Sequence, residues 1–185
     1  MSMLTHKPTH IVHVVYAFAT GGLENGVVNI INRLSEEDYR HTIVCVTDHD
    51  DDFFARITSK NVDIVDLNKP AGNGVAWLYH CWKLLRKLKP DICHSRNLSA
   101  LEAQLPAFLA GVPYRVHGEH GWDVNDLGGS NKKYQLLRKL YKPFIHQYVA
   151  LSKEAVSYLS DKINVKKHNI HHICNGVDID KFTPN

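Results

Sequence analysis

Short runs of apolar residues alternate along the chain with longer segments in which apolar residues recur every three or four positions. The run at 10–18 has few polar interruptions, which is typical of a strand buried on both faces of a parallel sheet. Further strands are predicted at 41–47, 62–67, 90–94, 114–118, 147–151 and 170–174. Helices are predicted at 23–34, 53–59, 74–88, 98–110, 132–144 and 152–160. The alternation predicts one α/β domain with a doubly wound, mostly parallel sheet of about seven strands and helices on both faces.

A two-glycine turn, Gly21-Gly22, joins the first predicted strand to the first predicted helix. Ligands of doubly wound sheets bind outside the carboxyl ends of the strands, which is where this turn lies. Glycine can take positive φ and let a ligand approach closely, and the N–H groups at the start of a helix attract phosphate. The more ordinary interpretation is punctuation between strand and helix, because 19–26 lacks the full G-x-G-x-x-G dinucleotide fingerprint.

Composition and charge narrow the classes of function. The chain has 185 residues, 44% hydrophobic and 22% charged, as expected of one globular domain. Its net charge of +3 is far from that of a dedicated nucleic-acid binder but leaves anionic ligands and a membrane surface open. We expect no leader and no membrane-spanning helix, because no sufficiently long apolar stretch is present. The four widely spaced cysteines favour reduced thiols and a cytoplasmic location.

Polar residues gather where four of the predicted strands end. These groups are Gly21-Gly22, 94–97, 119–123 and 152–154. Since parallel strands end at one edge of their sheet, we expect the groups to line a cleft there. They would supply the imidazole of His120, the guanidinium of Arg96 and the carboxylate of Asp123. Further candidate ligand-binding residues in these groups are His94, Asn97 and Ser152.

Several of these residues also have ordinary structural explanations. Ser152 stands where the N-cap of the following helix belongs, and capping is its more common role. A single histidine is usually structural, but the position of His120 just after a strand favours a contact with a ligand hydroxyl or carbonyl. For His94 and Arg96, ligand contact and a structural role are equally plausible, whereas His117 lies within its strand and is expected to be structural.

Motifs for several other chemistries are missing. The acidic run 48–52 has no spaced glycine and no closing glutamate, so it is interpreted as a solvated helix N-terminus and not as a calcium loop. The sequence has no G-x-S-x-G elbow, no H-E-x-x-H motif and no spaced cysteine and histidine ligands. Classical hydrolase and metal-site interpretations are therefore disfavoured.

The predicted helix 132–144 allows a second interpretation. The arc expected to pack on the sheet contains Tyr134, Leu136, Leu137, Leu140, Tyr141 and Phe144. The opposite, basic arc contains Lys132, Arg138, Lys139 and Lys142, and Lys133 breaks the pattern. The simpler interpretation is a packed helix with a solvated basic face. The alternative is peripheral contact with anionic lipid.

Five segments, in order, resemble the N-terminal Rossmann-like domain of the retaining GT-B glycosyltransferases often called family 4. They are 21–24, 91–97, 118–121, 149–152 and 173–184. The last is the most specific, because its N-G-V-D pattern followed by F-x-P is similar to the passage that leads, in that family, into the domain that binds the nucleotide sugar. The resemblance extends over nearly the whole chain.

The resemblance implies transfer of a sugar from a nucleotide-diphospho-sugar to a glycan or lipid-linked acceptor, with the anomeric configuration kept and with no metal or cofactor. Residues 1–174 would be the acceptor-side domain and 175–185 the start of an interdomain linker, so that the chain, lacking the C-terminal donor domain, would be inactive alone. His120 would be catalytic and face the donor sugar. The residues implied in substrate binding are Gly21, Gly22, His94, Arg96, Asn97, Asp123 and Ser152.

The partners implied are the sugar donor, the acceptor and the missing C-terminal domain, with no nucleic acid. The chain would be cytoplasmic, and contact through 132–144 would hold it at the inner face of the membrane. The alternative function is a stand-alone flavodoxin-like α/β module that binds a phosphorylated ligand without catalysis. The segment 175–184 favours the glycosyltransferase, because a self-contained domain has no need of an interdomain-like tail.

Overall fold

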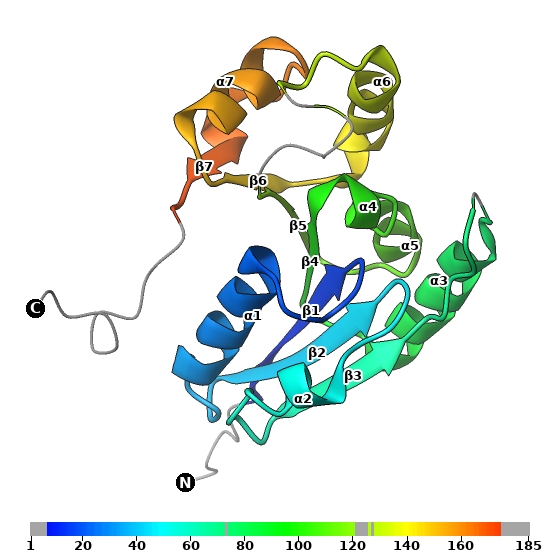
Figure 1. Ribbon diagram of the computed structural model, residues 1–185, viewed down its shortest axis with the longest axis vertical. Coiled ribbons are helices and arrows are strands. Elements are labelled where there is room, and N and C mark those ends of the chain that lie inside the picture. Colours follow the sequence, from blue (N-terminus) through cyan, green and yellow to red (C-terminus); the bar gives the residue numbers. More distant parts are fainter. Residues whose placement is uncertain (1–6, 73, 121–125, 127, 175–185) are drawn as a thin grey trace, which may run out of the picture.

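The computed structural model describes residues 7–72, 74–120, 126 and 128–174, which contain a seven-stranded, wholly parallel sheet (Figure 1). The strands are β1 (Thr9–Val15), β2 (Tyr39–Cys45), β3 (Val62–Asp66), β4 (Ile92–Arg96), β5 (Tyr114–Glu119), β6 (Gln147–Ala150) and β7 (Ile170–His172). Their order is β3-β2-β1-β4-β5-β6-β7, so the winding reverses between β1 and β4. The predicted doubly wound sheet is confirmed.

Helices cover both faces of the sheet, as predicted. On one face, α1 (Gly22–Arg33) and α2 (Asp51–Phe54) place Val27 and Phe53 in a core cluster with Val15 and Ile43. Elsewhere in the chain follow α3 (Ala76–Leu88), α4 (Asn97–Leu101), α5 (Gln104–Leu109), α6 (Lys132–Tyr141) and α7 (Lys153–Asp161). Two short 3-10 helices are η1 (Lys142–Phe144) and η2 (Lys167–Asn169).

The register of the sheet shows that α3 to α7 share the second face. Val14 is paired with Ser95, which is paired with His117, which is paired with Tyr148, so all four side chains point to the same side. Val14 packs in a cluster with residues of α3 and α5, and Tyr148 in a cluster with residues of α4, α6 and α7. Strand β1 is thus buried on both sides, which explains its nearly continuous apolar sequence.

The predicted helix 98–110 is wrong, because the chain forms two shorter helices there, α4 and α5. Pro106 is the physical reason. Proline has no N–H to donate to the carbonyl of Glu102, and its ring crowds the preceding turn, so Pro106 is accommodated in the first turn of a new helix, α5, and not within a continuous one. Gly111 follows α5 with φ +78°, which is consistent with a glycine that ends a helix.

The prediction for 132–144 is wrong about which side of the helix packs. Leu136 and Leu140 are 68% and 64% exposed, whereas Arg138 is 5% exposed and lies inside the protein. At about 100° per residue, Leu136 and Leu140 each lie about 160° from Arg138, so the apolar arc exists but its centre does not face the core. The side that packs inward contains Gln135, Arg138 and Tyr141.

Smaller predictions have mixed outcomes. The first strand ends at Val15 and not at Phe18, which forms an isolated bridge to His49. Asp50 caps α2 by accepting a hydrogen bond from the Phe53 N–H, so the acidic run does begin a helix. All four cysteines are free thiols. Among the described residues, no helix has both the length and the apolarity needed to cross a bilayer.

Candidate functional site

The candidate site lies where β1, β4 and β5 end, at the reversal of the winding. Loops on the two sides of such a reversal run in opposite directions and leave a crevice between them. The β1–α1 turn supplies Gly21, the end of β4 supplies Arg96, and the end of β5 leads into His120. Asp123 and 175–185 lie outside the described residues.

Gly21 is the N-cap of α1, and its nearest neighbour is the side chain of Glu24. Its φ is −165°, so the positive φ suggested for this turn is not what the structure shows. A Cβ atom on Gly21 would instead collide with the Glu24 carboxylate, while Gly22 has open space around it. Burial raises the pKa of Glu24, and its own backbone N–H and the charge of Arg96 act in the opposite direction.

Arg96 is a buried cation with few partners. Its side chain is 1% exposed, its Nη1 donates a hydrogen bond of 3.1 Å to His13 Nδ1, and its Nη2 has no hydrogen-bond partner within the described chain. Burial lowers its pKa to about 10, partly offset by the charges of Cys93 and Glu24, so Arg96 stays protonated at neutral pH. The end of β4 therefore carries a positive charge that no described carboxylate binds directly.

The histidines behind Arg96 are neutral. Because Arg96 donates to Nδ1 of His13, the proton of His13 is on Nε2, which is 3.0 Å from His41 Nδ1 and donates to it. Burial, together with the charge of Arg96, holds the pKa of His13 well below its usual value. Burial lowers the pKa of His41 to about 4. These neutral rings provide a polar surface for Arg96 without compensating its charge.

Ring nitrogens of His94 and His120 lie close to Gly118, in the space that a side chain at this strand position would need. A Cβ atom on Gly118 would lie 2.5 Å from His120 Nε2 and 3.2 Å from His94 Nε2. The backbone N–H of His120 donates to Asn97 Oδ1 over 2.8 Å, and Asn97 adopts φ +58° at the start of α4. Gly118 and Asn97 together fix where His120 lies.

Both imidazoles are neutral, and each has at least one ring nitrogen without a hydrogen-bond partner in the described chain. Burial lowers the pKa of His120 to about 3, with the charge of Arg96 acting in the same direction. Burial also holds the pKa of His94 well below its usual value. Neither ring nitrogen of His120 nor the Nε2 of His94 has a hydrogen-bond partner among the residues described. A neutral imidazole offers one N–H donor and one acceptor, which suits a hydroxyl group.

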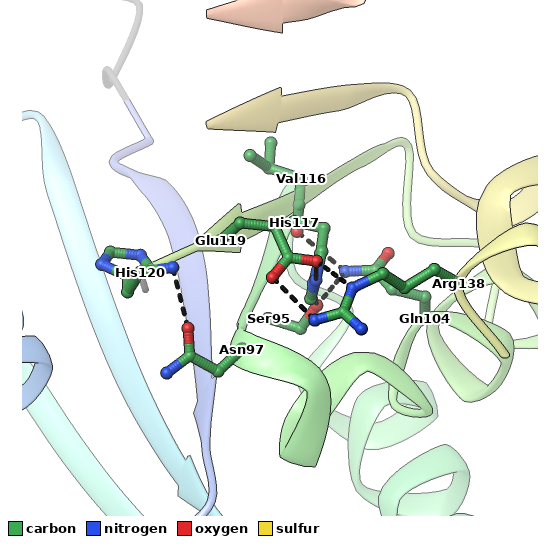
Figure 2. Close-up of polar contacts among 8 residues, drawn as sticks. All are labelled: Ser95, Asn97, Gln104, Val116, His117, Glu119, His120 and Arg138. Carbon is green, nitrogen blue, oxygen red and sulfur yellow. Dashed lines mark hydrogen bonds and ion pairs between the residues drawn. The ribbon is translucent and has the colours of Figure 1, made fainter. Parts of the chain in front are cut away.

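A second polar group lies behind β5, on the opposite face of the sheet (Figure 2). Arg138 of α6 donates two hydrogen bonds to Glu119, from Nε to Oε1 over 2.6 Å and from Nη2 to Oε2 over 3.1 Å. Burial raises the pKa of Glu119, but hydrogen bonds from His117 and Arg138 outweigh it and bring the pKa to about 2. In Figure 2, the ring of His120 points away from this pair.

The hydrogen bonds of this network continue into α5. Gln104 donates to Ser95 Oγ over 2.7 Å and to the carbonyl of Val116 over 2.8 Å. Ser95 then donates to His117 Nδ1 over 2.8 Å, which leaves the His117 proton on Nε2, facing Glu119 Oε1 at 3.5 Å. His117 is fully buried, so its predicted structural role is confirmed.

The structure brings some of the candidate residues together and leaves others apart. Arg96, His94 and His120 form one cluster, and Glu24 links it electrostatically to the Gly21 turn. Ser152 instead accepts a hydrogen bond from the Ala155 N–H and caps α7, and no described contact joins it to the cluster. The substrate-binding roles of all these residues remain predictions.

Sequence reasoning assigned no contact in the site or its scaffold to Glu24, Glu119 or Arg138. Glu24 lies three residues after Gly21 in the first turn of α1, and this spacing could have placed it over the glycine. No sequence signal marks Arg138, which the fold places on the inner side of α6 together with Gln135 and Tyr141. Among the described residues, no three histidine, cysteine, aspartate or glutamate side chains are grouped as a metal site.

Comparisons with known proteins agree with this architecture. The sequence profile of Glycosyltransferase Family 4 matches residues 20–181. A glycosyltransferase from Rickettsia africae superposes with a TM-score of 0.69 at 20% identity, over 95% of this chain and 45% of its own. Anabaena HepE, in complex with UDP and glucose, superposes with a TM-score of 0.70 at 15% identity, over 93% of this chain and 46% of its own.

A third similar structure is the lipopolysaccharide outer core galactosyltransferase WaaB, with a TM-score of 0.67 at 14% identity. It is matched over 92% of this chain and 47% of its own, so the chain spans a little under half the length of all three structures. No curated protein sequence is significantly similar to the chain. The profile match extends over most of the 185 residues, and the chain therefore belongs to glycosyltransferase family 4.

Proposed function

We propose that the chain is the acceptor-side half of a retaining glycosyltransferase, which transfers a sugar from a nucleotide-diphospho-sugar to a glycan or lipid-linked acceptor. The observation that carries the proposal is the cluster of Arg96, His94 and His120 at the winding reversal, whose buried polar atoms lack partners among the described residues. Buried polar groups are normally satisfied within the fold, so unsatisfied ones at a ligand edge favour a substrate as the missing partner.

His120 acts in this proposal as a neutral hydrogen-bond partner of the donor sugar. Because its pKa is about 3, the His120 ring is neutral at neutral pH and cannot serve as a general acid. The neutral ring can still donate a hydrogen bond to a hydroxyl group or accept one from it. Asn97 and Gly118 fix its position. Its contribution would thus be orientation of the sugar, an effect that can account for several kcal/mol of the barrier.

Arg96 supplies the positive charge of the site. Nucleotide sugars are diphosphates, and a protonated, incompletely paired guanidinium in low dielectric attracts an anionic group more strongly than a solvated one does. Anabaena HepE was solved with UDP-glucose, and WaaB is named a galactosyltransferase, which supports a nucleotide sugar as the donor class. No metal and no cofactor enter the proposal.

The 185 residues by themselves are expected to bind ligand weakly and to transfer no sugar. They span a little under half of the similar structures, and one wall of a cleft cannot hold two reacting groups at the 3–3.5 Å or so that transfer needs. A lipid-linked acceptor would also require access to a membrane. The proposed contact through 132–144 now rests on Leu136 and Leu140, which the helix leaves exposed.

The test compares this chain with a longer one that includes the coding sequence after Asn185, using a panel of nucleotide sugars and acceptors. We expect turnover only in the longer chain, and His120→Ala should lower its rate about a hundredfold or more. His168→Ala, at an exposed histidine of η2, is the matched control. Equal turnover by the short chain, or full activity of His120→Ala, would refute the proposal.

A further inference from the structure

The carboxylate of Glu24 folds back over the turn that begins α1. It lies against Gly21, where a Cβ atom would collide with it, and it accepts a hydrogen bond from its own backbone N–H. Gly21 is the N-cap of α1 and has no side chain to cap the first turn, in which Glu24 is the acidic residue. The N–H groups at the start of a helix attract anions. Glu24 therefore occupies the position at which this helix would hold the anionic group of a ligand.

The backbone of the turn is held more firmly than the carboxylate above it. Asn25 donates two hydrogen bonds to the carbonyl of Gly21, from its backbone N–H over 2.9 Å and from its Nδ2 over 2.7 Å. Burial raises the pKa of the Glu24 carboxyl, and the hydrogen bond from its own N–H and the charge of Arg96 act against this rise. Burial outweighs them, so water solvates the ionised carboxylate better than the turn does. A more strongly bound anion can therefore displace it.

Arg96 is independent evidence that this place takes an anion. Residues two apart on a strand share a face, and His94 is paired with His13, which is paired with Ile43. Ile43 packs in the core cluster that contains Val27 of α1. Arg96 therefore points to the face of the sheet that α1 covers, and it does so at the end of β4, on the edge where α1 begins.

The helix terminus and the buried cation act on the same carboxylate. Although burial has the largest influence on the pKa of both groups, the charge of Arg96 lowers that of Glu24 and the charge of Glu24 raises that of Arg96. No ion pair joins these two described residues, and the Nη2 of Arg96 is buried without a hydrogen-bond partner in the described chain. A Cβ atom on Gly22 would meet nothing within 4 Å, so the turn is open beside Glu24.

We propose that Glu24 is a built-in competitor of the ligand: its carboxylate occupies the anion position at the start of α1 in the free protein and leaves when a phosphate group binds between α1 and Arg96. A diphosphate carries more charge and more acceptor oxygens than a carboxylate, so it can accept from the first turn and from Arg96 together. The identification of this anion as the diphosphate of a nucleotide sugar rests on the proposed function. Glu24 would thus select against weakly charged ligands, because only a strong anion displaces it.

The experiment is an NMR titration of the chain and its variants with inorganic pyrophosphate, a method that also measures weak binding. Glu24→Gln keeps the size of the side chain and removes its charge, whereas Glu24→Ala removes the competitor altogether. Each should lower the dissociation constant of pyrophosphate about tenfold or more, as expected if the carboxylate is in place in about nine of ten molecules or more. The backbone amide signals of Gly22 and Leu23 should shift with the added pyrophosphate.

The matched control is Glu37→Gln, which removes the same charge at an exposed position beyond the other end of α1. A helix of 12 residues is about 18 Å long, so screening should limit its effect to about twofold. The double variant Glu24→Gln/Arg96→Met should lose the gained affinity, because the cation is missing. The proposal is overturned if Glu24→Gln binds pyrophosphate no more tightly than the original chain, if Glu37→Gln gains as much, or if none of these proteins binds it.

The carboxyl carbon of Glu24 provides a second readout. Its chemical shift should change as pyrophosphate saturates the original chain, since the carboxylate leaves the turn for water, and that of Glu37 should not. An unchanged Glu24 signal at saturation would contradict the displacement. Pyrophosphate binding needs no sugar transfer, so the two proposals fail separately. If the longer chain transfers no sugar and Glu24→Gln still binds more tightly, the proposed function is wrong and the competitor role stands; transfer without this gain in affinity gives the reverse result.

Discussion

Arg96 and Arg138 are both buried, and their surroundings differ in one decisive respect. Arg138 is 5% exposed and donates two hydrogen bonds to Glu119, and the bonds and charge of that carboxylate raise its pKa despite burial. Arg96 is 1% exposed and lies among neutral histidines, and burial lowers its pKa. Arg138 joins α6 to β5, whereas Arg96, which no described carboxylate binds directly, lies at the edge where ligands of such sheets bind.

The contrast separates stability from function. Removing one member of a buried ion pair leaves the other charge without compensation, which is strongly destabilising. An unpaired buried cation costs stability instead of adding to it, so the fold itself gives no reason to keep it. We therefore interpret the Glu119–Arg138 pair as part of the scaffold and Arg96 as part of the candidate site.

The largest expected effect is loss of stability in mild acid, caused by the histidines around Arg96. His13 and His41 have folded pKa values below their unfolded value of 6.5, so the unfolded chain binds protons that the folded chain does not. Stability is complete above that pH and falls toward pH 4. At about 1.4 kcal/mol per pH unit, His41 alone should remove about 2 kcal/mol by pH 5, and His13 adds to the loss in the same direction.

Urea unfolding at pH 7.5, 6 and 5 measures this. A matched series on His41→Asn should show a shallower decline, since one of the buried titrating histidines is gone. A free energy of unfolding that stays constant over this pH range would show that these histidines are already protonated or not buried. The description of the surroundings of Arg96 would then be wrong.

Breaking the ion pair should have the next largest effect. Arg138→Met leaves the Glu119 carboxylate buried with His117 as the one remaining neighbouring side-chain donor among the described residues, and the free energy of unfolding should fall by about 3–5 kcal/mol. The control is Arg40→Met, which removes an ion pair of 2.8 Å to Asp63 whose side chains are 49% and 57% exposed. It should cost less than about 1 kcal/mol. Similar losses in the two variants would remove the distinction between the scaffold pair and a surface pair.

A smaller effect on stability is expected from substitution of Gly118, which lies against the ring of His120. Gly118→Ala places a Cβ atom 2.5 Å from His120 Nε2, so the ring must move, and stability should fall by about 1–3 kcal/mol. Gly22→Ala meets open space in the first turn of α1 and should change stability by less than about 1 kcal/mol. Chemical shifts of the His120 ring report the displacement directly. Unchanged chemical shifts of the His120 ring in Gly118→Ala would contradict the described position of the ring against Gly118.

The difference between the two arginines also marks how far the sequence could be interpreted. The strands were predictable because a strand buried on both faces is recognised from its own apolar sequence, without knowledge of distant residues. The grouping of candidate residues at the carboxyl edge followed from the parallel topology of the sheet. Both arginines were assigned by local pattern alone: Arg138 to a solvated arc, and Arg96 equally to a ligand or a structural role. What distinguishes them is a carboxylate 19 residues away in the chain, which only the fold brings into contact.

The smallest effect on stability is expected for Arg96→Met. It removes one hydrogen bond to His13 and also one uncompensated buried charge, so the two contributions oppose each other. The free energy of unfolding should change by less than about 2 kcal/mol. A loss as large as that of Arg138→Met would show that Arg96 holds the fold together and would argue against its separate role.

The most direct test is the rate of sugar transfer in the longer chain, measured for Arg96→Met and for Arg40→Met at a temperature where both are folded. If Arg96 is kept to bind an anionic group of a substrate, its removal should lower the rate about a hundredfold or more, with most of the stability retained. Arg40→Met should transfer sugar at the original rate, because Arg40 lies on the exposed surface of β2. Full activity of Arg96→Met would contradict the assignment of the cluster as the ligand site.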